Sequence, residues 1–417
     1  MTDKIAVIGL GYVGLPLAVE FSKKYHTFGY DCKQDRIDSI KEGCDITGEV
    51  SKKNLSSSSL ILTSKLDSIQ SCNIYIIAVP TPIDTDNKPN LSALLNASTD
   101  VGKILSKNDI VIYESTVYPG CTEEKCVPIL ESISGLKFNS DFFCGYSPER
   151  INPGDKKRTL TKIVKVTSGS NKKTLKKVDA LYKSIIDKGT FPVSSIKIAE
   201  AAKIIENCQR DINIAFVNEL SMLFNLMKID TKEVLEAAGT KWNFLPFTPG
   251  LVGGHCIGVD PYYLTYKAKK LGYESKIILS GRELNDSMAD YVCTRIEKKF
   301  FENNVKIEKA KILLLGITFK ENCTDSRNSK LIDIYDILIN KGAEIDVYDP
   351  LAIQSELNQN KIILSSFTYV NKNKYDCIIV GVSHNEFKII NIKDLLRNNK
   401  SIVFDIKGTY KDKFERL

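Results

Sequence analysis

The stretch Lys4–Gly14, KIAVIGLGYVG, places a short apolar strand directly before a turn that contains three glycines. Apolar residues then recur at helical spacing through Phe21. Strand, glycine turn and helix in this order form the fingerprint of a dinucleotide-binding fold. Gly9 permits the tight turn, Gly11 lets a pyrophosphate reach the backbone, and Gly14 allows the helix to pack closely on the strand. The sequence therefore predicts that the chain begins with a Rossmann-like domain.

An acidic residue follows the second expected strand of this domain. Asp31 comes directly after Thr27–Tyr30, about 20 residues beyond the glycine turn. An acid at this place binds the ribose hydroxyls of adenosine and repels a 2′-phosphate, so the sequence favours NAD over NADP. The N-terminus of the preceding helix also favours the charge of a pyrophosphate. Arg36 has three possible places: over the adenine, against a phosphate, or on the surface of a helix.

Hydroxyl groups follow two further strands, at the edge where ligands sit in doubly wound folds. The apolar run 74–79 leads into Thr81, and the run 110–113 leads into Thr116. A later strand, 142–146, enters the loop 147–154, in which prolines flank Glu149 and Arg150. The loop is either a fixed ligand loop or a surface segment with a chance pairing of charges.

Length and composition are those of a globular chain with two or three domains. The chain has 417 residues, of which 43% are hydrophobic and 26% charged. The formal net charge of +7 is spread over many lysines, which suits a small anionic ligand and is weak support for nucleic acid. No apolar run is long enough to cross a membrane, and the N-terminus leads straight into a strand. The 11 cysteines contain no Cys-x-x-Cys pair, so we expect a reduced, cytoplasmic protein without a metal.

The middle of the chain predicts one long helix, from about Ser195 to Met227, which no proline or glycine interrupts. A helix of this length bridges domains or pairs with a copy of itself, and we infer a homodimer. Lys203 and Asn207 share one face of it, and Arg210 lies near that face. Spacing alone favours a solvated face over a cleft for these groups.

Downstream of this helix, the loop Pro249–Pro261 places glycines on both sides of Cys256. Glycine carries no Cβ, so such a loop can approach a bound molecule closely. A thiol held this way is either a nucleophile or a small buried apolar residue. The residues of the loop leave both possibilities open.

A second α/β unit closes the chain, with apolar strands expected at 311–316, 344–349, 376–381 and 401–405. The loop 317–322 lacks the three glycines, so we expect a nucleotide attached to another group in place of a second dinucleotide. Lys320 and Arg327 are its available phosphate partners; the alternative is a structural domain without a ligand. The predicted fold class is α/β, with two Rossmann-like doubly wound parallel-sheet domains, 1–194 and 305–417, joined by a central helical domain, 195–304.

Over nearly its whole length the chain resembles the UDP-glucose/GDP-mannose dehydrogenase family. The motifs that carry the resemblance are Gly9–Pro16, Glu114–Gly120, Pro148-Glu149-Arg150, Lys203 with Asn207, Gly253–Cys256, Phe319-Lys320 and Asp325-Ser326-Arg327.

Within this family, the segments Lys241–Leu245 and Gly253–Tyr263 look like those of the branch that oxidises UDP-N-acetylhexosamines for Vi-type capsules and O-antigens. UDP-glucose enzymes typically have a serine where His255 stands, so this histidine marks the branch and is not the obligatory activator of the thiol. Lys407 stands where those enzymes often carry an arginine. UDP-N-acetylglucosamine is the expected substrate, with UDP-N-acetylgalactosamine and UDP-glucose as alternatives.

The resemblance implies a four-electron oxidation of the C6 alcohol with two NAD⁺, in which Cys256 forms a thiohemiacetal and then a thioester. It also implies roles for other residues. The catalytic set is Cys256, Lys203, Asn207, Asp260, Glu149 and Thr116. The NAD-binding set is Gly9, Gly11, Tyr12, Val13, Gly14, Asp31, Arg36, Thr81, Thr116 and Arg327. The set that binds the nucleotide sugar is Glu149, Arg150, Ile151, Lys203, Asn207, Arg210, Gly253 and Lys320.

Two other classes of protein remain as alternatives. A two-electron hydroxyacid dehydrogenase combines a similar fold with a long central helix and does not need Cys256. A catalytically silent NAD-binding regulator would require the chemical residues to be degraded, and none of them is.

Overall fold

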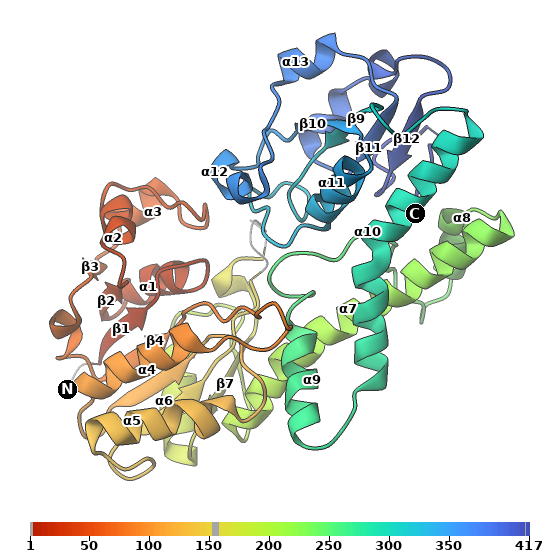
Figure 1. Cartoon of the computed structure of the whole chain (residues 1–417). Helices are drawn as coiled ribbons and strands as arrows, with labels where there is room; N and C mark the ends of the chain where they lie inside the picture. The colour runs from red at the N-terminus through yellow and green to blue at the C-terminus, as the bar shows by residue number, and fades with distance from the viewer. Residues whose placement is uncertain (1–2, 152–157, 413) are drawn as a thin grey trace. The chain divides into compact units, whose positions relative to one another are not determined.

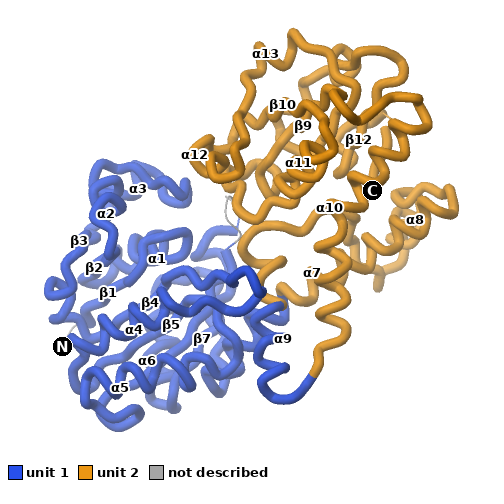
Figure 2. The backbone as a smooth tube through the Cα atoms, viewed as in Figure 1, with its two compact units in different colours: residues 1–206, 262–273 blue, residues 207–261, 274–417 orange. Residues whose placement is uncertain are grey.

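The computed structural model describes residues 3–151, 158–412 and 414–417 (Figure 1). Of the loop 147–154, residues 152–154 therefore lie outside the described residues. The chain divides into two compact units (Figure 2). Unit 1 comprises residues 1–206 and 262–273, and unit 2 comprises residues 207–261 and 274–417.

The described residues of unit 1 form one eight-stranded sheet with the order β3-β2-β1-β4-β5-β6-β7-β8. Its strands are β1 (Lys4–Ile8), β2 (His26–Tyr30), β3 (Ile61–Thr63), β4 (Ile74–Ile77), β5 (Ile110–Tyr113), β6 (Phe143–Tyr146), β7 (Lys165–Gly169) and β8 (Thr190–Pro192). The pairs from β3 to β6 are parallel, in the order of a dinucleotide-binding fold. The predicted fold class is confirmed here, but β7 pairs antiparallel with β6, so the sheet is mixed.

The helices described in unit 1 are α1 (Gly14–Ser22), α2 (Gln34–Lys41), α3 (Lys52–Ser56), α4 (Ser92–Ile104), α5 (Val127–Ser134), α6 (Lys172–Lys183) and most of α9 (Asp260–Lys270). Of these, α1, α2, α4 and α6 contact strands of the sheet. In α1, Leu17 and Phe21 lie one turn apart, and both are fully buried with Ile5 and Val7 of β1. The core thus fixes the glycine turn between β1 and α1 at the carboxyl edge of the sheet.

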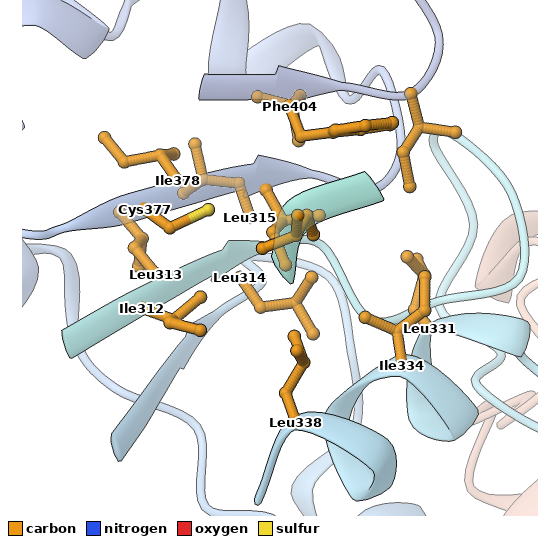
Figure 3. Packing of buried hydrophobic residues seen from close by; sticks show 14 of the residues in the cluster. Ile312, Leu313, Leu314, Leu315, Leu331, Ile334, Leu338, Cys377, Ile378 and Phe404 are labelled. Atoms are coloured by element: carbon orange, nitrogen blue, oxygen red, sulfur yellow. The ribbon is translucent and has the colours of Figure 1, made fainter. Parts of the chain in front are cut away.

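Unit 2 contains a four-stranded parallel sheet with the order β10-β9-β11-β12. Its strands are β9 (Lys311–Leu315), β10 (Glu344–Tyr348), β11 (Cys377–Val380) and β12 (Ile402–Asp405), and the helices beside it are α11 (Lys330–Asn340), α12 (Gln354–Leu357) and α13 (Phe367–Lys372). Figure 3 shows Leu331, Ile334 and Leu338 of α11, which share a core with β9, β11 and β12. Full burial of each such side chain contributes about 2 kcal/mol to folding.

The predicted long helix is confirmed as α7 (Ile196–Met227), with 32 residues. Next comes α8 (Thr231–Ala238), whose cap is Asp230, since its side chain accepts a hydrogen bond from the amide of Glu233 at 3.1 Å. A carboxylate just before the helix reaches the third amide of the first turn, which Thr231, already helical, does not.

A second long helix, α10 (Lys276–Glu302), lies beside α7 in unit 2. Arg282 of α10, 2% exposed, donates to Asp211 of α7 at 2.6 Å, and Asn285 donates to the same carboxylate oxygen at 2.8 Å. Burial raises the pKa of Asp211, although the guanidinium opposes that shift. These buried polar contacts fix the register of the two helices. No helix within the described ranges is both long enough and apolar enough to cross a bilayer.

Candidate active site

The glycine turn after β1 has the geometry that the sequence predicts. Gly9 has a positive φ of +89°, which L-residues rarely adopt. A Cβ on Gly14 would lie 1.8 Å from the carbonyl oxygen of Gly9, so α1 can begin here only with glycine. A Cβ on Gly11 would meet nothing within 4 Å, which leaves open space over the turn.

Asp31 and Arg36 bind the backbone of this turn at Leu10. Asp31 accepts from the amides of Leu10 and Lys33, both at 3.0 Å, and its oxygens retain further lone pairs. Arg36 donates through Nε and Nη2 to the carbonyl of Leu10 at 2.9 and 2.7 Å, and Nη2 also pairs with Asp45. Its side chain is 9% exposed, so the alternative of a surface helix arginine is wrong.

These residues fit a dinucleotide. Val13 stands at the N-cap of α1 with a side chain that cannot cap the helix, and Tyr12 before it is half-buried. The N-terminus of α1 thus has no side-chain cap and favours an anion, although the Leu15 amide donates to the carbonyl of Gly11 at 3.2 Å and Pro16 has no N–H. Nη1 of Arg36 is buried without a hydrogen-bond partner. Open space over Gly11, a helix N-terminus without a side-chain cap and spare lone pairs on Asp31 together suit NAD.

The two hydroxyl loops meet at the same edge of the sheet. Thr81 donates from its hydroxyl to the carbonyl of Thr116 at 2.7 Å, and Tyr263 of α9 donates to the carbonyl of Thr81 at 2.7 Å. Thr81 and Thr116 are both half-buried. The loops after β4 and β5 are therefore joined beside the glycine turn, as their places in the sequence predict.

Glu149 belongs to a buried charge cluster in unit 1. Its Oε1 accepts from the amides of Arg150 and Ile151, at 2.5 and 2.8 Å, and its Oε2 accepts from Lys165 at 2.6 Å. Lys165 also donates to Glu114 at 2.7 Å, and the phenol of Tyr182 donates to Glu114 at 2.5 Å. Burial raises the pKa of Glu114 to about 7, although Lys165 opposes that shift. Burial by itself disfavours the Lys165 ammonium, but the two carboxylates outweigh it and raise its pKa.

Arg150 connects the Glu149 loop with α7. Its Nη1 donates to the backbone carbonyl of Lys203 at 3.0 Å, and its Nη2 pairs with Glu206. The loop therefore lies against the first half of α7 within unit 1. This contact is a fixed one, which argues against a chance surface pairing of charges.

The polar face of α7 is buried. Lys203 is 6% exposed and Asn207 2%, so the solvated face that their spacing alone favours is wrong. Within unit 2, Asn207 donates to Asp260 at 2.5 Å, and Arg210 donates to Asn207 at 2.8 Å. Asp260 begins α9, and its amide donates to the carbonyl of Cys256 at 2.9 Å. This chain of contacts leads from α7 to the cysteine loop.

Cys256 is half-buried, unlike the other ten cysteines. Two, Cys32 and Cys44, are exposed, and the remaining eight are buried. The reading of Cys256 as a small buried residue therefore does not hold. A partly accessible thiol near buried polar groups is the environment that a nucleophilic cysteine needs.

Gly253 and Gly254, near Cys256, pack against other parts of unit 2. A Cβ on Gly253 would lie 2.5 Å from the carbonyl oxygen of Asn328, and one on Gly254 would lie 2.8 Å from the ring of Phe319. We expected this loop to approach a bound molecule, and in unit 2 it approaches the loop after β9. His255 adds a further tie, because its Nε2 lies 2.8 Å from Asp325.

The remaining third-domain residues lie in the same loop. Arg327 is exposed and donates two side-chain hydrogen bonds to Asp325, at 3.0 and 2.8 Å. Burial raises the pKa of Asp325, but His255 and Arg327 outweigh it and hold that pKa well below its usual range. Lys320 is half-buried, with its ammonium 5.5 Å from the ring centroid of Phe319.

Several buried polar residues of unit 1 were missed in the sequence analysis. Glu114 lies in one of the family motifs but was given no role, and Lys165 and Tyr182 of the charge cluster were not singled out. Glu200, which does not belong to that cluster, was not singled out either. Glu200 of α7 accepts from the amides of Gly120 and Thr122, at 2.5 and 2.9 Å, and burial raises its pKa to about 7. A lysine that opens an otherwise uncharged strand was the one available signal for Lys165.

The fold and the site together define a class: an NAD-dependent oxidoreductase with a cysteine loop and a second nucleotide-type sheet. The chain belongs to the UDP-glucose/GDP-mannose dehydrogenase family. The family's NAD-binding domain matches residues 3–186, its central domain residues 197–287, and its UDP-binding domain residues 313–412. The chain is therefore a nucleotide-sugar dehydrogenase that uses NAD.

Named relatives and a solved structure cover nearly the whole chain. It is 52% identical to a UDP-N-acetyl-D-glucosamine 6-dehydrogenase of Pseudomonas aeruginosa, over 97% of this chain and 96% of that protein. It is 51% identical, with the same coverage, to one of Salmonella typhi. A UDP-D-ManNAc dehydrogenase from Pyrococcus horikoshii has a similar structure, with a TM-score of 0.89 and 31% identity over 99% of this chain and 98% of that one.

Proposed function

We propose that this chain oxidises the C6 alcohol of UDP-N-acetylglucosamine to the carboxylate, for the synthesis of a surface polysaccharide. The half-buried thiol of Cys256, in a loop tied to the buried Asn207–Asp260 pair, is the observation that carries the four-electron scheme. An alcohol-to-aldehyde oxidation alone needs no such nucleophile. The choice of sugar is supported by two relatives that share 52% and 51% sequence identity with this chain and are named UDP-N-acetyl-D-glucosamine 6-dehydrogenases.

In this mechanism, Cys256 holds the substrate between two oxidations. When bound, NAD⁺ accepts the hydride in each of them. The thiolate attacks the C6 aldehyde to give a thiohemiacetal, whose oxidation gives a thioester that water hydrolyses. Covalent capture keeps the reactive aldehyde on the protein throughout.

Other residues stabilise charge and prepare the water. Lys203 and Asn207, one helical turn apart, supply a cation and an amide for the oxyanion that develops at C6. Asp260 with Thr116 orients the water for thioester hydrolysis, and Glu149 supports that step as a carboxylate. Arg150, Arg210, Gly253 and Lys320 bind the nucleotide sugar, and Arg327 binds NAD.

A substrate panel tests the proposal. Purified protein is incubated with UDP-N-acetylglucosamine, UDP-N-acetylgalactosamine and UDP-glucose, and NADH and uronic acid are counted for each sugar. We expect two NADH per uronic acid, with UDP-N-acetylglucosamine preferred. One NADH per sugar would contradict the four-electron scheme, and a preference for another sugar would change the substrate. NAD binding without any turnover would favour a silent regulator.

Variants of the thiol test the mechanism. Cys256→Ser should lower the rate of uronic acid formation by about 1,000-fold or more, because the serine hydroxyl stays protonated at neutral pH and is a far weaker nucleophile than a thiolate. Cys44→Ser is the matched control, since it removes an exposed thiol in unit 1. Full product formation by Cys256→Ala would favour a two-electron hydroxyacid dehydrogenase.

We further propose that the protein is a cytoplasmic homodimer that associates through the α7 region. Phe216 of α7 is 53% exposed, and Trp242 and Leu245 in the following loop are 97% and 51% exposed. Several large apolar side chains that are exposed in one region indicate a surface that binds another protein chain. Light scattering on wild type and Trp242→Ser tests this, and a wild-type mass of one chain would contradict it. Fractionation of cells tests the location.

A further inference from the structure

Four side chains from four segments of unit 1 form the charge cluster that contains Glu149. The side chains of Glu114, Glu149 and Lys165 are 0%, 5% and 3% exposed, and Tyr182 is fully buried. Glu114 follows β5 and Glu149 follows β6. Lys165 begins β7, and Tyr182 lies in α6. Two carboxylates therefore share one ammonium in the interior, an arrangement that costs desolvation energy for every charge.

The two carboxylates differ in how well their charge is stabilised. Glu149 accepts from two backbone amides in addition to Lys165, whereas Glu114 accepts from a neutral phenol in addition to Lys165. Amide donors aimed at a carboxylate favour its ionised form. When both acids are ionised the three charged groups carry a net charge of −1, so a proton that enters the cluster goes to the less stabilised acid.

We propose that Lys165 and Glu114 are positioning residues of the reaction: Lys165 holds Glu149 as a carboxylate, and Glu114 takes up the proton that the cluster binds. This inference rests on the proposed function, because it assigns Glu149 to thioester hydrolysis. A raised pKa of about 7 at Glu114, caused first by burial, agrees with that division.

The neighbouring groups described next do not neutralise the charge of the cluster, so its two carboxylates rely on Lys165. Arg150, next to Glu149, points its guanidinium to Glu206 and to the carbonyl of Lys203. From α6, the phenol of Tyr182 also faces Ser147, which carries no charge. The Lys165 ammonium lies 5.4 Å from the ring centroid of Tyr182, a contact that further favours its charged form.

Two substitutions should separate the roles of these two residues in the acidic limb of activity. Glu114→Gln fixes the side chain in the neutral form that Glu114 takes when it binds the proton, so the acidic limb should stay at the wild-type pH. Lys165→Met leaves two acids without a cation, so the limb should move to higher pH. The measurements are the pH profile of kcat and the single-turnover decay of the acyl-enzyme.

Glu200→Gln is the matched control. Its carboxyl is also buried in unit 1, with a pKa raised to about 7 by burial, but it accepts from Gly120 and Thr122 and not from Lys165. This variant should change stability without moving the acidic limb. Should Lys165→Met fail to fold, Glu114→Gln, which is nearly isosteric, still decides which acid binds the proton.

A stability measurement tests the proton assignment without turnover. The raised pKa means that native Glu114 binds its proton more tightly than the unfolded chain does. The free energy of unfolding of wild type should therefore fall relative to Glu114→Gln as pH rises from about 5 to about 8. A flat difference would overturn the assignment of the proton to Glu114.

The outcomes separate this inference from the proposed function. A limb that moves to higher pH in Lys165→Met and stays in place in Glu114→Gln and Glu200→Gln supports it. An unmoved limb in Lys165→Met with normal folding would reduce the cluster to a structural support and overturn the inference. A limb that moves to lower pH in Glu114→Gln would mean that Glu149 binds the proton and would overturn it too. If wild type forms no uronic acid from any sugar in the panel, the proposed function fails, and the stability comparison alone still decides where the proton binds.

Discussion

The first strands of the two sheets continue into loops of the same design. Gly9 after β1 and Gly316 after β9 have φ of +89° and +87°. In each sheet an aspartate that follows the second strand accepts from an amide of the loop: Asp31 from Leu10 at 3.0 Å, and Asp349 from Ile317 at 2.8 Å. One backbone device thus recurs in both sheets.

The two aspartates differ in what else surrounds them. Asp31 is half-buried and binds a turn that has open space at Gly11. Asp349 is 5% exposed, and its Oδ2 lies 3.2 Å from Nε2 of His384. His384 is fully buried; its Nδ1 accepts from the amide of Asn322, and its Nε2 donates to Asp349. An acid after the second strand therefore marks a ribose site only where no other group occupies it.

The loops also differ in their partners. The loop after β1 leaves room over Gly11, while the loop after β9 packs on the cysteine loop through Phe319, Asp325 and Asn328. The first loop is thus suited to a cofactor, and the second supports the segment that presents the thiol. Substitutions in the two loops test this contrast.

The largest effect is expected at the second aspartate. Asp349→Ala leaves several backbone amides without an acceptor and removes one of the two partners of His384 Nε2, the other being the Thr318 hydroxyl, so it should lower the free energy of unfolding by about 3 kcal/mol or more. Asp31→Ala should cost about 1 kcal/mol and mainly weaken NAD binding. Chemical denaturation and NAD titration check both. Equal losses of stability would contradict the contrast.

Gly14 and Gly11 separate folding from cofactor binding within the first loop. Gly14→Ala places a Cβ 1.8 Å from the carbonyl oxygen of Gly9 and should cost about 3 kcal/mol. Gly11→Ala meets no atom within 4 Å, so stability should be unchanged while NAD affinity falls by about tenfold or more. Calorimetry with and without NAD gives both quantities. Unchanged NAD affinity in Gly11→Ala would place the pyrophosphate elsewhere.

Substitution of His255 tests whether its contact with Asp325 helps to position the loop that carries Cys256. Its side chain is 35% exposed, so His255→Ala should lower kcat by about tenfold at most, with little change in NAD affinity. His255→Gln, which keeps a donor for Asp325, should restore most of the rate. Loss of NAD affinity with an unchanged kcat would mean that His255 acts through Arg327.

The smallest effect is confined to acid pH. Hydrogen bonds and His384 outweigh burial and hold the pKa of Asp349 below its ordinary value, so the native state binds its proton less tightly than the unfolded state. Its contribution to stability is full above about pH 4 and is lost as pH falls through the native pKa. Thermal unfolding of wild type and Asp349→Asn between about pH 3 and pH 7 should converge at the acid end. A constant difference would contradict this sign.

Local patterns predicted the parts of the molecule that local geometry decides. The glycine fingerprint predicted this turn because glycine suits the positive φ at Gly9 and because a Cβ on Gly14 would clash with the carbonyl oxygen of Gly9. The uninterrupted periodicity of α7 predicted its length. Glu114 and Lys165 were missed because they are 51 positions apart, and only the antiparallel pairing of β7 with β6 brings them together.

Polar side chains whose surroundings depend on packing were also misread. The burial of Lys203 and Asn207 could not follow from spacing, since a helical face is solvated or covered according to what packs on it.

The distribution of the cysteines suits the protein to labelling at a single position. Cys32 and Cys44 are exposed, Cys256 is half-buried, and the other eight thiols lie in the interior. With the two exposed ones replaced by serine, a small alkylating dye would mark one position, at the centre of the chemistry. The fluorescence of that single label would then report ligand occupancy in real time, without a new cysteine being introduced.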